Sequence, residues 1–194
     1  YADKVDAWNG KGQIIVLTGQ RRVGKSFILK DFVERHKNEP QTNFIYINKE
    51  RKTFDAIKTH EQLNVYIDEH IMEDAHNFIL IDEVQEIEGW EKSVRNYRLE
   101  DDTDIIITGS NSKMLSSELS TLIGGRYQEI YIQSLSYQEF ILFHGLEEGD
   151  DALLKYINYG GLPGLKQIGL DDEELVWDYI KGVYHTVVLK DIVE

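Results

Sequence analysis

The sequence predicts an α/β fold in which helices cover both faces of a parallel sheet. Apolar runs of strand length recur along the chain, helix-like segments separate them, and a glycine-rich loop joins the first run to the first helix. The expected strands are residues 13–17, 43–48, 77–81, 104–108 and 127–132. Several of these runs are continuously apolar, as in strands buried on both faces, so the alternation indicates a doubly wound layer. Ligands of such sheets bind at the carboxyl ends of the strands.

The glycine-rich loop, TGQRRVGKS at residues 18–26, matches the pattern G-x-x-x-x-G-K-[ST] at every fixed position. Gly19 and Gly24 let the backbone turn tightly and direct its N–H groups inward. Lys25 offers an ammonium to β- and γ-phosphates, and Ser26 offers a hydroxyl to Mg²⁺ at the positive end of a helix. A glycine-rich turn that matches by chance is the alternative, but the order strand, loop, helix favours a phosphate-binding loop.

The nucleotide contacts are expected from Gly19, Arg22, Val23, Gly24, Lys25, Ser26 and Phe27. Arg21 and Arg22 occupy the variable part of the loop, where we expect them to pair with acids or to shape the loop rather than to catalyse. Guanine is disfavoured as the base because the chain has no N-K-x-D segment, which leaves adenine as the default.

A second motif, FILIDE at residues 78–83, describes a buried strand that ends in a carboxylate. Asp82 is expected to hold Mg²⁺, as strand-end aspartates do in P-loop enzymes. Glu83 could polarise a water molecule for attack on the γ-phosphate, which would make the protein a hydrolase. The alternative is an acidic surface turn that continues through Glu86, Glu88 and Glu91.

Polar residues also follow the fourth strand and precede the fifth. Ser110 or Asn111 could sense the γ-phosphate or orient the water, although the same residues are typical of a helix N-cap. Arg126 follows two glycines just before the fifth strand, and could reach the γ-phosphate of a neighbouring subunit as an arginine finger. The alternative for Arg126 is a surface arginine that the helix dipole stabilises.

The pattern changes to helices after residue 133, so we expect a core over residues 1–133 and a helical lid over residues 134–194. Capping boxes are predicted at Ser136 with Glu139 and at Asp171 with Glu174. The second box should open a long helix, and its expected apolar stripe is Leu175, Tyr179, Val183 and Val187. In the core, Trp90 is expected to anchor the start of a helix, the alternative being a surface aromatic that faces a partner.

Composition restricts the possible partners of this 194-residue chain. A formal net charge of -14 argues against a broad nucleic-acid surface, and no apolar run is long enough to cross a bilayer. The chain has no cysteine, and its histidines lack metal-ligand spacing, so we expect a cytoplasmic protein without a zinc site. Because the sequence starts at Tyr1 and stops within an amphipathic pattern, we expect a fragment.

Together, TGQRRVGKS, FILIDEVQEIEGWEK, IIITGSNSKMLSSELSTLIGGRY, LSYQEF and YGGLP resemble the predicted AAA+ ATPases of bacteria and archaea that carry a C-terminal domain of unknown function. The resemblance covers nearly all of residues 11–194. It implies a Walker A loop at residues 19–26, a Walker B pair of Asp82 with the catalytic Glu83, a sensor at Asn111 or Ser110, and a finger at Arg126. It also implies strand order 5-1-4-3-2, a helical lid and a further C-terminal region. The chain departs from the wider AAA+ pattern because its lid has no arginine.

The function expected from these residues is Mg²⁺-dependent hydrolysis of ATP that switches attached domains or partners. Those partners are a homo-oligomer formed through Arg126, an unknown protein, or the missing C-terminal domain. Two alternatives are a P-loop kinase, which would need an acceptor pocket, and a scaffold that binds ATP without hydrolysing it.

Overall fold

A five-stranded sheet with strand order β2-β3-β4-β1-β5 forms the centre of the first part of the chain. Every neighbouring pair is parallel, and read from the other edge the order is 5-1-4-3-2, as predicted. The computed structural model describes residues 1–109, 121 and 123–187. The strands are β1 (Ile14–Thr18), β2 (Thr42–Asn48), β3 (His76–Asp82), β4 (Thr103–Thr108) and β5 (Tyr127–Tyr131). Each end of each strand lies within one residue of the predicted end, because the continuous apolar runs correspond to the buried strands.

The chain divides into two compact units. The first consists of Tyr1–Thr18 with Lys25–Tyr131, and the second of Gly19–Gly24 with Ile132–Glu194. The sheet therefore lies in the first unit, whereas the variable part of the glycine-rich loop groups with the helices of the second.

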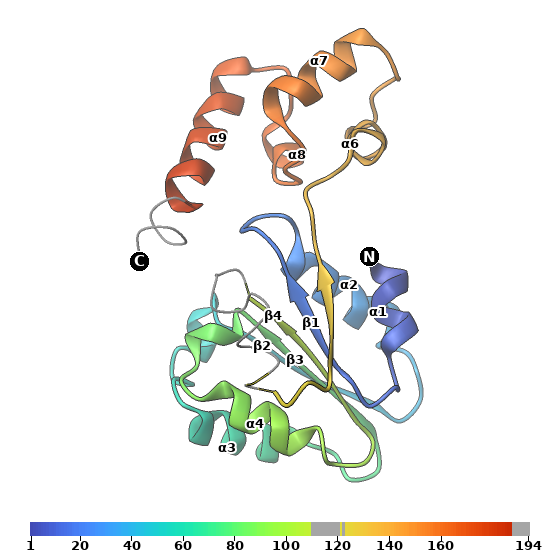
Figure 1. Ribbon diagram of the computed structural model, residues 1–194, viewed down its shortest axis with the longest axis vertical. Helices are drawn as coiled ribbons and strands as arrows, with labels where there is room; N and C mark the ends of the chain where they lie inside the picture. Colours follow the sequence, from blue (N-terminus) through green and yellow to red (C-terminus); the bar gives the residue numbers. More distant parts are fainter. Residues whose placement is uncertain (110–120, 122, 188–194) are drawn as a thin grey trace. The chain divides into compact units, whose positions relative to one another are not determined.

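Helices cover both faces of the sheet in the first unit (Figure 1). They are α1 (Ala2–Trp8), α2 (Lys25–His36), α3 (His60–His70) and α4 (Trp90–Tyr97), with short 3-10 turns η1 (Lys52–Phe54) and η2 (Val84–Glu86). Leu63 of α3 and Val94 of α4 share a buried cluster with Ile79 of β3. The preceding strand residue, Phe78, faces the other way and packs on Phe32 of α2, with ring centroids 5.2 Å apart. The strict alternation of a β-strand thus supplies both faces with apolar side chains.

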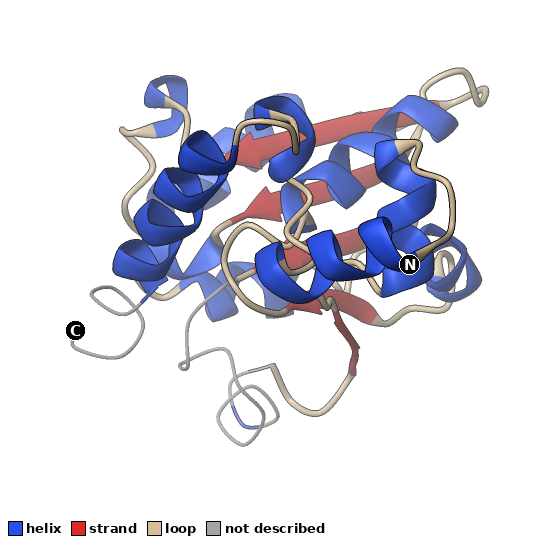
Figure 2. Cartoon of the chain, turned by 90° about the horizontal axis from the view of Figure 1, so that it is seen from above, coloured by secondary structure: helices blue, strands red, loops and turns tan. Residues whose placement is uncertain are grey.

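Helix α4 begins at Trp90, which is only 7% exposed and joins the same buried cluster. The predicted anchoring role of Trp90 is therefore confirmed, and the alternative of a partner-facing surface aromatic is wrong. In Figure 2 the strands of the sheet lie side by side in red, with the helices in blue.

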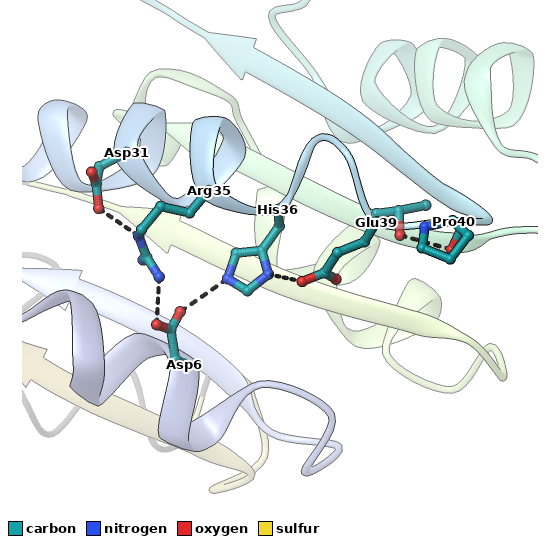
Figure 3. A network of polar contacts seen from close by, with 7 residues as sticks. Asp6, Asp31, Arg35, His36, Glu39 and Pro40 are labelled. Atoms are coloured by element: carbon teal, nitrogen blue, oxygen red, sulfur yellow. Dashed lines mark hydrogen bonds and ion pairs between the residues drawn. The ribbon is translucent and has the colours of Figure 1, made fainter.

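Polar contacts tie α1 to the end of α2 (Figure 3). The carboxylate of Asp6 accepts hydrogen bonds from Arg35 and, at 3.1 Å, from His36 Nε2. Arg35 also donates to Asp31 at 2.8 Å, and His36 Nδ1 contacts Glu39 at 2.6 Å. Partial burial of Asp6 opposes ionisation, but the two hydrogen bonds and the positive charge of Arg35 lower its pKa below the ordinary 3.8. The contacts fix the helix that begins at Lys25 against the segment that precedes β1.

The second unit is helical after Tyr131. Its helices are α6 (Tyr137–His144), α7 (Asp150–Tyr159), α8 (Leu165–Ile168) and α9 (Glu173–Val187). Their core is formed by Phe140, Leu165, Leu170 and Val176. Gly161 lets the turn before α8 pack closely against the backbone of Leu135, since a Cβ atom at residue 161 would lie 2.0 Å from the carbonyl oxygen of Leu135.

The two predicted capping boxes have different outcomes. Ser136 with Glu139 caps α6 as expected, with both reciprocal hydrogen bonds present. At α9 the prediction is wrong by one residue, because Asp172 rather than Asp171 accepts from the backbone N–H groups of Glu174 and Leu175, each at 3.1 Å. Two adjacent aspartates offer the same chemistry, and only the backbone path selects one of them.

The apolar stripe of α9 also differs from the prediction. Val183 is buried as expected, but Leu175 is 53% exposed and the neighbouring Val176 is buried in its place. The predicted stripe is therefore wrong at Leu175 and correct at Val183. Within the described part of the chain, no helix is long and apolar enough to span a membrane.

Candidate functional site

The site is organised around Asp82, a fully buried carboxylate at the carboxyl end of β3. Its Oδ1 atom accepts hydrogen bonds from Ser26 Oγ at 3.0 Å and from Thr108 Oγ1 at 2.6 Å. Its Oδ2 atom accepts from Asn48 Nδ2 at 2.8 Å and from Tyr46 OH at 3.3 Å. The charge is thus compensated by hydroxyl and amide donors, as a buried carboxylate requires.

These donors converge because three parallel strands end at one edge. β2 ends at Asn48, which stands directly opposite Asp82 in the register, and β4 ends at Thr108. Ser26 comes from the first turn of α2. The amide of Asn48 is oriented by the N–H of Glu50, which donates to its Oδ1 at 2.9 Å, so the Nδ2 group is left to face Asp82.

The hydroxyl of Tyr46 stays protonated at physiological pH. Burial, with the negative charge of Asp82 as a second cause, raises the pKa of Tyr46 to about 12. A neutral phenol can donate to the carboxylate, whereas a phenolate would repel it. Tyr46 therefore acts as a constant hydrogen-bond donor to Asp82.

Glu83 follows Asp82 in a left-handed backbone conformation, with φ 58° and ψ 54°. That conformation is uncommon for a residue with a Cβ atom. The N–H of Glu83 donates to Thr108 Oγ1 at 3.0 Å, so one hydroxyl connects the backbone of Glu83 to the side chain of Asp82. The carboxylate of Glu83 accepts a hydrogen bond from Gln85 Nε2, and the residue is 8% exposed. The carboxylate of Glu83 thus accepts from a residue of its own turn, whereas that of Asp82 accepts from neighbouring strands and α2.

Lys25 and Ser26 are the first residues of α2. Lys25 is only 4% exposed, which is unusual for a lysine. Phe27, in contrast, is 72% exposed. Of these first residues of α2, Ser26 contacts Asp82, whereas Phe27 lies at the surface.

The preceding loop residues, 19–24, belong to the second unit. Gly19 and Gly24 have φ values of 135° and 105°, in the range that favours glycine, and a Cβ atom on Gly19 would lie 2.2 Å from the carbonyl oxygen of Ile132. Val23 is 5% exposed. The guanidinium of Arg22 lies over the ring of Tyr179, 5.9 Å from its centroid, so its described contact is aromatic rather than acidic.

Two predicted groups lie away from this constellation or outside the described residues. Ser110 and Asn111 fall outside the residues that the structure describes. Arg126 is exposed, and its carbonyl oxygen accepts from the N–H of Ile14 at the start of β1. Because all strands are parallel, Arg126 lies at the amino edge of the sheet, opposite the edge that carries Asp82.

Four residues of this site were not predicted from the sequence: Tyr46, Asn48, Thr108 and Gln85. Asn48 and Thr108 carried a usable signal, since each is the polar residue that closes an apolar strand at the ligand-binding edge. Tyr46 and Gln85 carried none, because their partners are set by side-chain direction.

Comparison with known proteins agrees with this geometry. The family model described as an AAA domain matches residues 11–141. The chain belongs to the AAA domain family. It is therefore related to the AAA+ P-loop ATPases, which are nucleotide-binding proteins.

Relatives of this AAA domain occur in bacteria and archaea. The chain is 35% identical over 187 residues to an uncharacterized protein of Haemophilus influenzae, a match that covers 92% of this chain and 46% of the relative. It is 33% identical over 200 residues to the uncharacterized protein MJ1544 of Methanocaldococcus jannaschii, covering 94% of this chain and 42% of the relative. The chain thus spans less than half the length of these curated relatives.

A solved structure is also similar in fold. Cdc6p from Pyrobaculum aerophilum matches with a TM-score of 0.55 and 16% sequence identity, over 98% of this chain and 62% of that one. At this identity, the likeness supports the AAA+ fold alone.

Proposed function

We propose that the chain binds ATP with Mg²⁺ and hydrolyses it to ADP and inorganic phosphate. The observation that carries the proposal is the pair formed by the Ser26 hydroxyl and the buried Asp82 carboxylate, 3.0 Å apart, with Glu83 next in the chain. A hydroxyl and a carboxylate at this position are the protein ligands that P-loop enzymes use for Mg²⁺.

The donor set fits Mg²⁺ in its chemistry. Ser26 and Asp82 offer only oxygen atoms, which Mg²⁺ prefers, and phosphate and water oxygens complete its usual shell. Asp82 is held by Asn48, Thr108 and Tyr46, so its carboxylate keeps its direction when the Ser26 hydroxyl changes partner. When bound, the ion would neutralise charge on the phosphate oxygens.

The other loop residues supply the phosphate contacts in this proposal. Gly19 and Gly24 keep side chains out of the loop, and the N-terminal end of α2 offers backbone N–H groups to an anion. The ammonium of Lys25 would pair with β- and γ-phosphates, and the uncovered surface of Phe27 would be available to the nucleotide. Arg22 and Val23 shape the loop, the former through its contact with Tyr179.

Glu83 is the proposed general base. A water oxygen forms a bond to the γ-phosphorus, the bond from that phosphorus to the β–γ bridging oxygen breaks, and the proton of the water passes to the Glu83 carboxylate. ADP leaves with the bridging oxygen. The backbone hydrogen bond to Thr108 fixes Glu83 beside Asp82, which supports a role for both carboxylates in one reaction.

We further propose that Arg126 acts on the nucleotide of a second copy of the chain. Its place at the edge opposite Asp82 removes it from the site of its own chain, and its exposure leaves the guanidinium available to a neighbour. Asn111 or Ser110 remains the proposed sensor. Since the relatives are about twice as long as the matched region, we propose that ATP turnover switches attached domains or partners.

Phosphate release from Mg-ATP tests this function. We expect the wild-type chain to release phosphate, and Glu83→Gln to lower the rate by at least about 100-fold while binding a fluorescent ATP analogue normally. Glu86→Gln, which makes the same change of charge at an exposed position, should match the wild type, and excess EDTA should abolish turnover. Equal turnover by Glu83→Gln and the wild type would contradict the assignment. Tight binding without any release of phosphate would support a non-hydrolysing scaffold instead.

A further inference from the structure

Gln85 lies two residues beyond Glu83 in the short turn η2. Its Nε2 group donates to Glu83 Oε2. The opposite orientation of the amide would place two oxygen atoms in contact, so the chemistry of the pair fixes which end of Gln85 faces the carboxylate. One end of this side chain is therefore committed to Glu83.

The other end of Gln85 has no hydrogen-bond partner within the described part of the chain. Its Oε1 atom is buried and accepts no hydrogen bond from the residues that the structure describes. Buried acceptors in native proteins are normally satisfied, and an exception points to a ligand or a water molecule. The amide of Gln85 thus has an unsatisfied acceptor atom next to the carboxylate of the proposed base.

The backbone holds this pair rigidly. The N–H of Glu86 donates to the carbonyl oxygen of Glu83 at 3.1 Å, and the N–H of Ile87 donates to that of Val84 at 3.1 Å. Val84 and Ile87 are fully or almost fully buried, which anchors both ends of the turn. These contacts maintain the left-handed conformation of Glu83. The turn thereby places the side chain of Gln85 against the carboxylate of Glu83.

We propose that Gln85 is a further residue of the hydrolytic site, whose Nε2 group positions the Glu83 carboxylate and whose Oε1 atom accepts a hydrogen bond from the attacking water. This inference rests on the ATPase function proposed above. A water molecule has two protons to donate. With one donated to Glu83 and the other to Gln85 Oε1, the water presents a lone pair to the phosphorus. Glu83 takes its proton during attack, and Gln85 stays neutral throughout.

The test compares Gln85→Met with Glu86→Gln in the full 194-residue chain. Methionine keeps the length of the side chain and removes both polar ends, whereas Glu86→Gln alters an exposed neighbour in the same turn. We expect Gln85→Met to lower kcat at least about tenfold, with KM and the Kd for a fluorescent ATP analogue within about twofold of wild type. Glu86→Gln should leave all three unchanged. A purely structural role would change the melting temperature and nucleotide affinity along with kcat.

A second variant covers the case in which Gln85→Met folds poorly. Gln85→Glu keeps the shape and an oxygen acceptor but replaces the donor to Glu83 with a second carboxylate, and we expect it also to lower kcat with ATP binding retained. Turnover within twofold of wild type in Gln85→Met would overturn the inference while leaving the ATPase intact. Absence of any Glu83-dependent turnover in the wild type would instead overturn the proposed function, and the inference with it.

Discussion

Thr108 performs two tasks with one hydroxyl. It donates to Asp82 Oδ1 at 2.6 Å and accepts from the backbone N–H of Glu83 at 3.0 Å, and it is completely buried. Each of the two adjacent carboxylate residues therefore depends on it for its position. A hydroxyl is the smallest group that can serve both a donor and an acceptor at once.

Replacing this hydroxyl should destabilise the protein. We expect Thr108→Val, which keeps the shape, to lower the free energy of unfolding by about 1–3 kcal/mol, because a buried N–H and a buried carboxylate each lose a partner. Urea denaturation measures the change. Thr108→Ser keeps the hydroxyl and should cost less than the valine variant. Equal stability of the valine and serine variants would contradict this account.

At the scale of the elements, the strands deliver polar residues to one edge and the helices differ in how they begin. The strand β3 ends in Asp82 and is flanked on both sides by strands that end in polar residues, which makes the site a property of the parallel sheet. Helix α9 begins one residue later than predicted, because Asp172 caps it. The position of the cap therefore sets where the helix begins.

The cap of α9 can be tested with two adjacent aspartates. Asp172→Ala should destabilise the start of the helix by about 1 kcal/mol, since two backbone N–H groups lose their acceptor. Asp171→Ala removes the same charge next to it and should have a much smaller effect. Hydrogen exchange of the amides in Glu173–Val187 measures the difference. Faster exchange in the Asp171 variant than in the Asp172 variant would restore the sequence-based prediction.

At the scale of the whole molecule, the proposed catalytic groups do not all lie at the same edge of the sheet. Asp82 and Glu83 are at the carboxyl edge of the sheet, and Arg126 is at the amino edge. If Arg126 contributes to hydrolysis, a second copy of the chain must bring it to the site. Activity should then rise more steeply than linearly with protein concentration.

Mixing two inactive variants tests this arrangement. Arg126→Ala and Glu83→Gln should each have little activity, but an equimolar mixture should recover part of it, because some assemblies pair an intact Glu83 with an intact Arg126. Phosphate release measures the recovery, and Arg95→Ala, in an exposed stretch of α4, serves as the control. A mixture no more active than the sum of its parts would show that Arg126 does not act in trans.

The sequence by itself determined the fold and the centre of the candidate site. Parallel strands buried on both faces are continuously apolar. The positions of the strands, and the location of Asp82 at the end of one of them, could therefore be predicted from the sequence. The glycine positions of the loop were readable because only glycine tolerates the backbone found at Gly19.

The tertiary structure alone decided which side chains surround Asp82 and Glu83. Tyr46, Asn48 and Thr108 are distant from Asp82 in sequence. The strand-end positions of Asn48 and Thr108 are visible in the sequence, but their contacts with Asp82, like that of Tyr46, form only when the strands are aligned in register. The contact between Gln85 and Glu83 depends on a left-handed backbone turn that a glutamate seldom adopts. Hydrophobic periodicity records which residues are buried, whereas the direction of a polar side chain depends on neighbours that only the folded chain brings together.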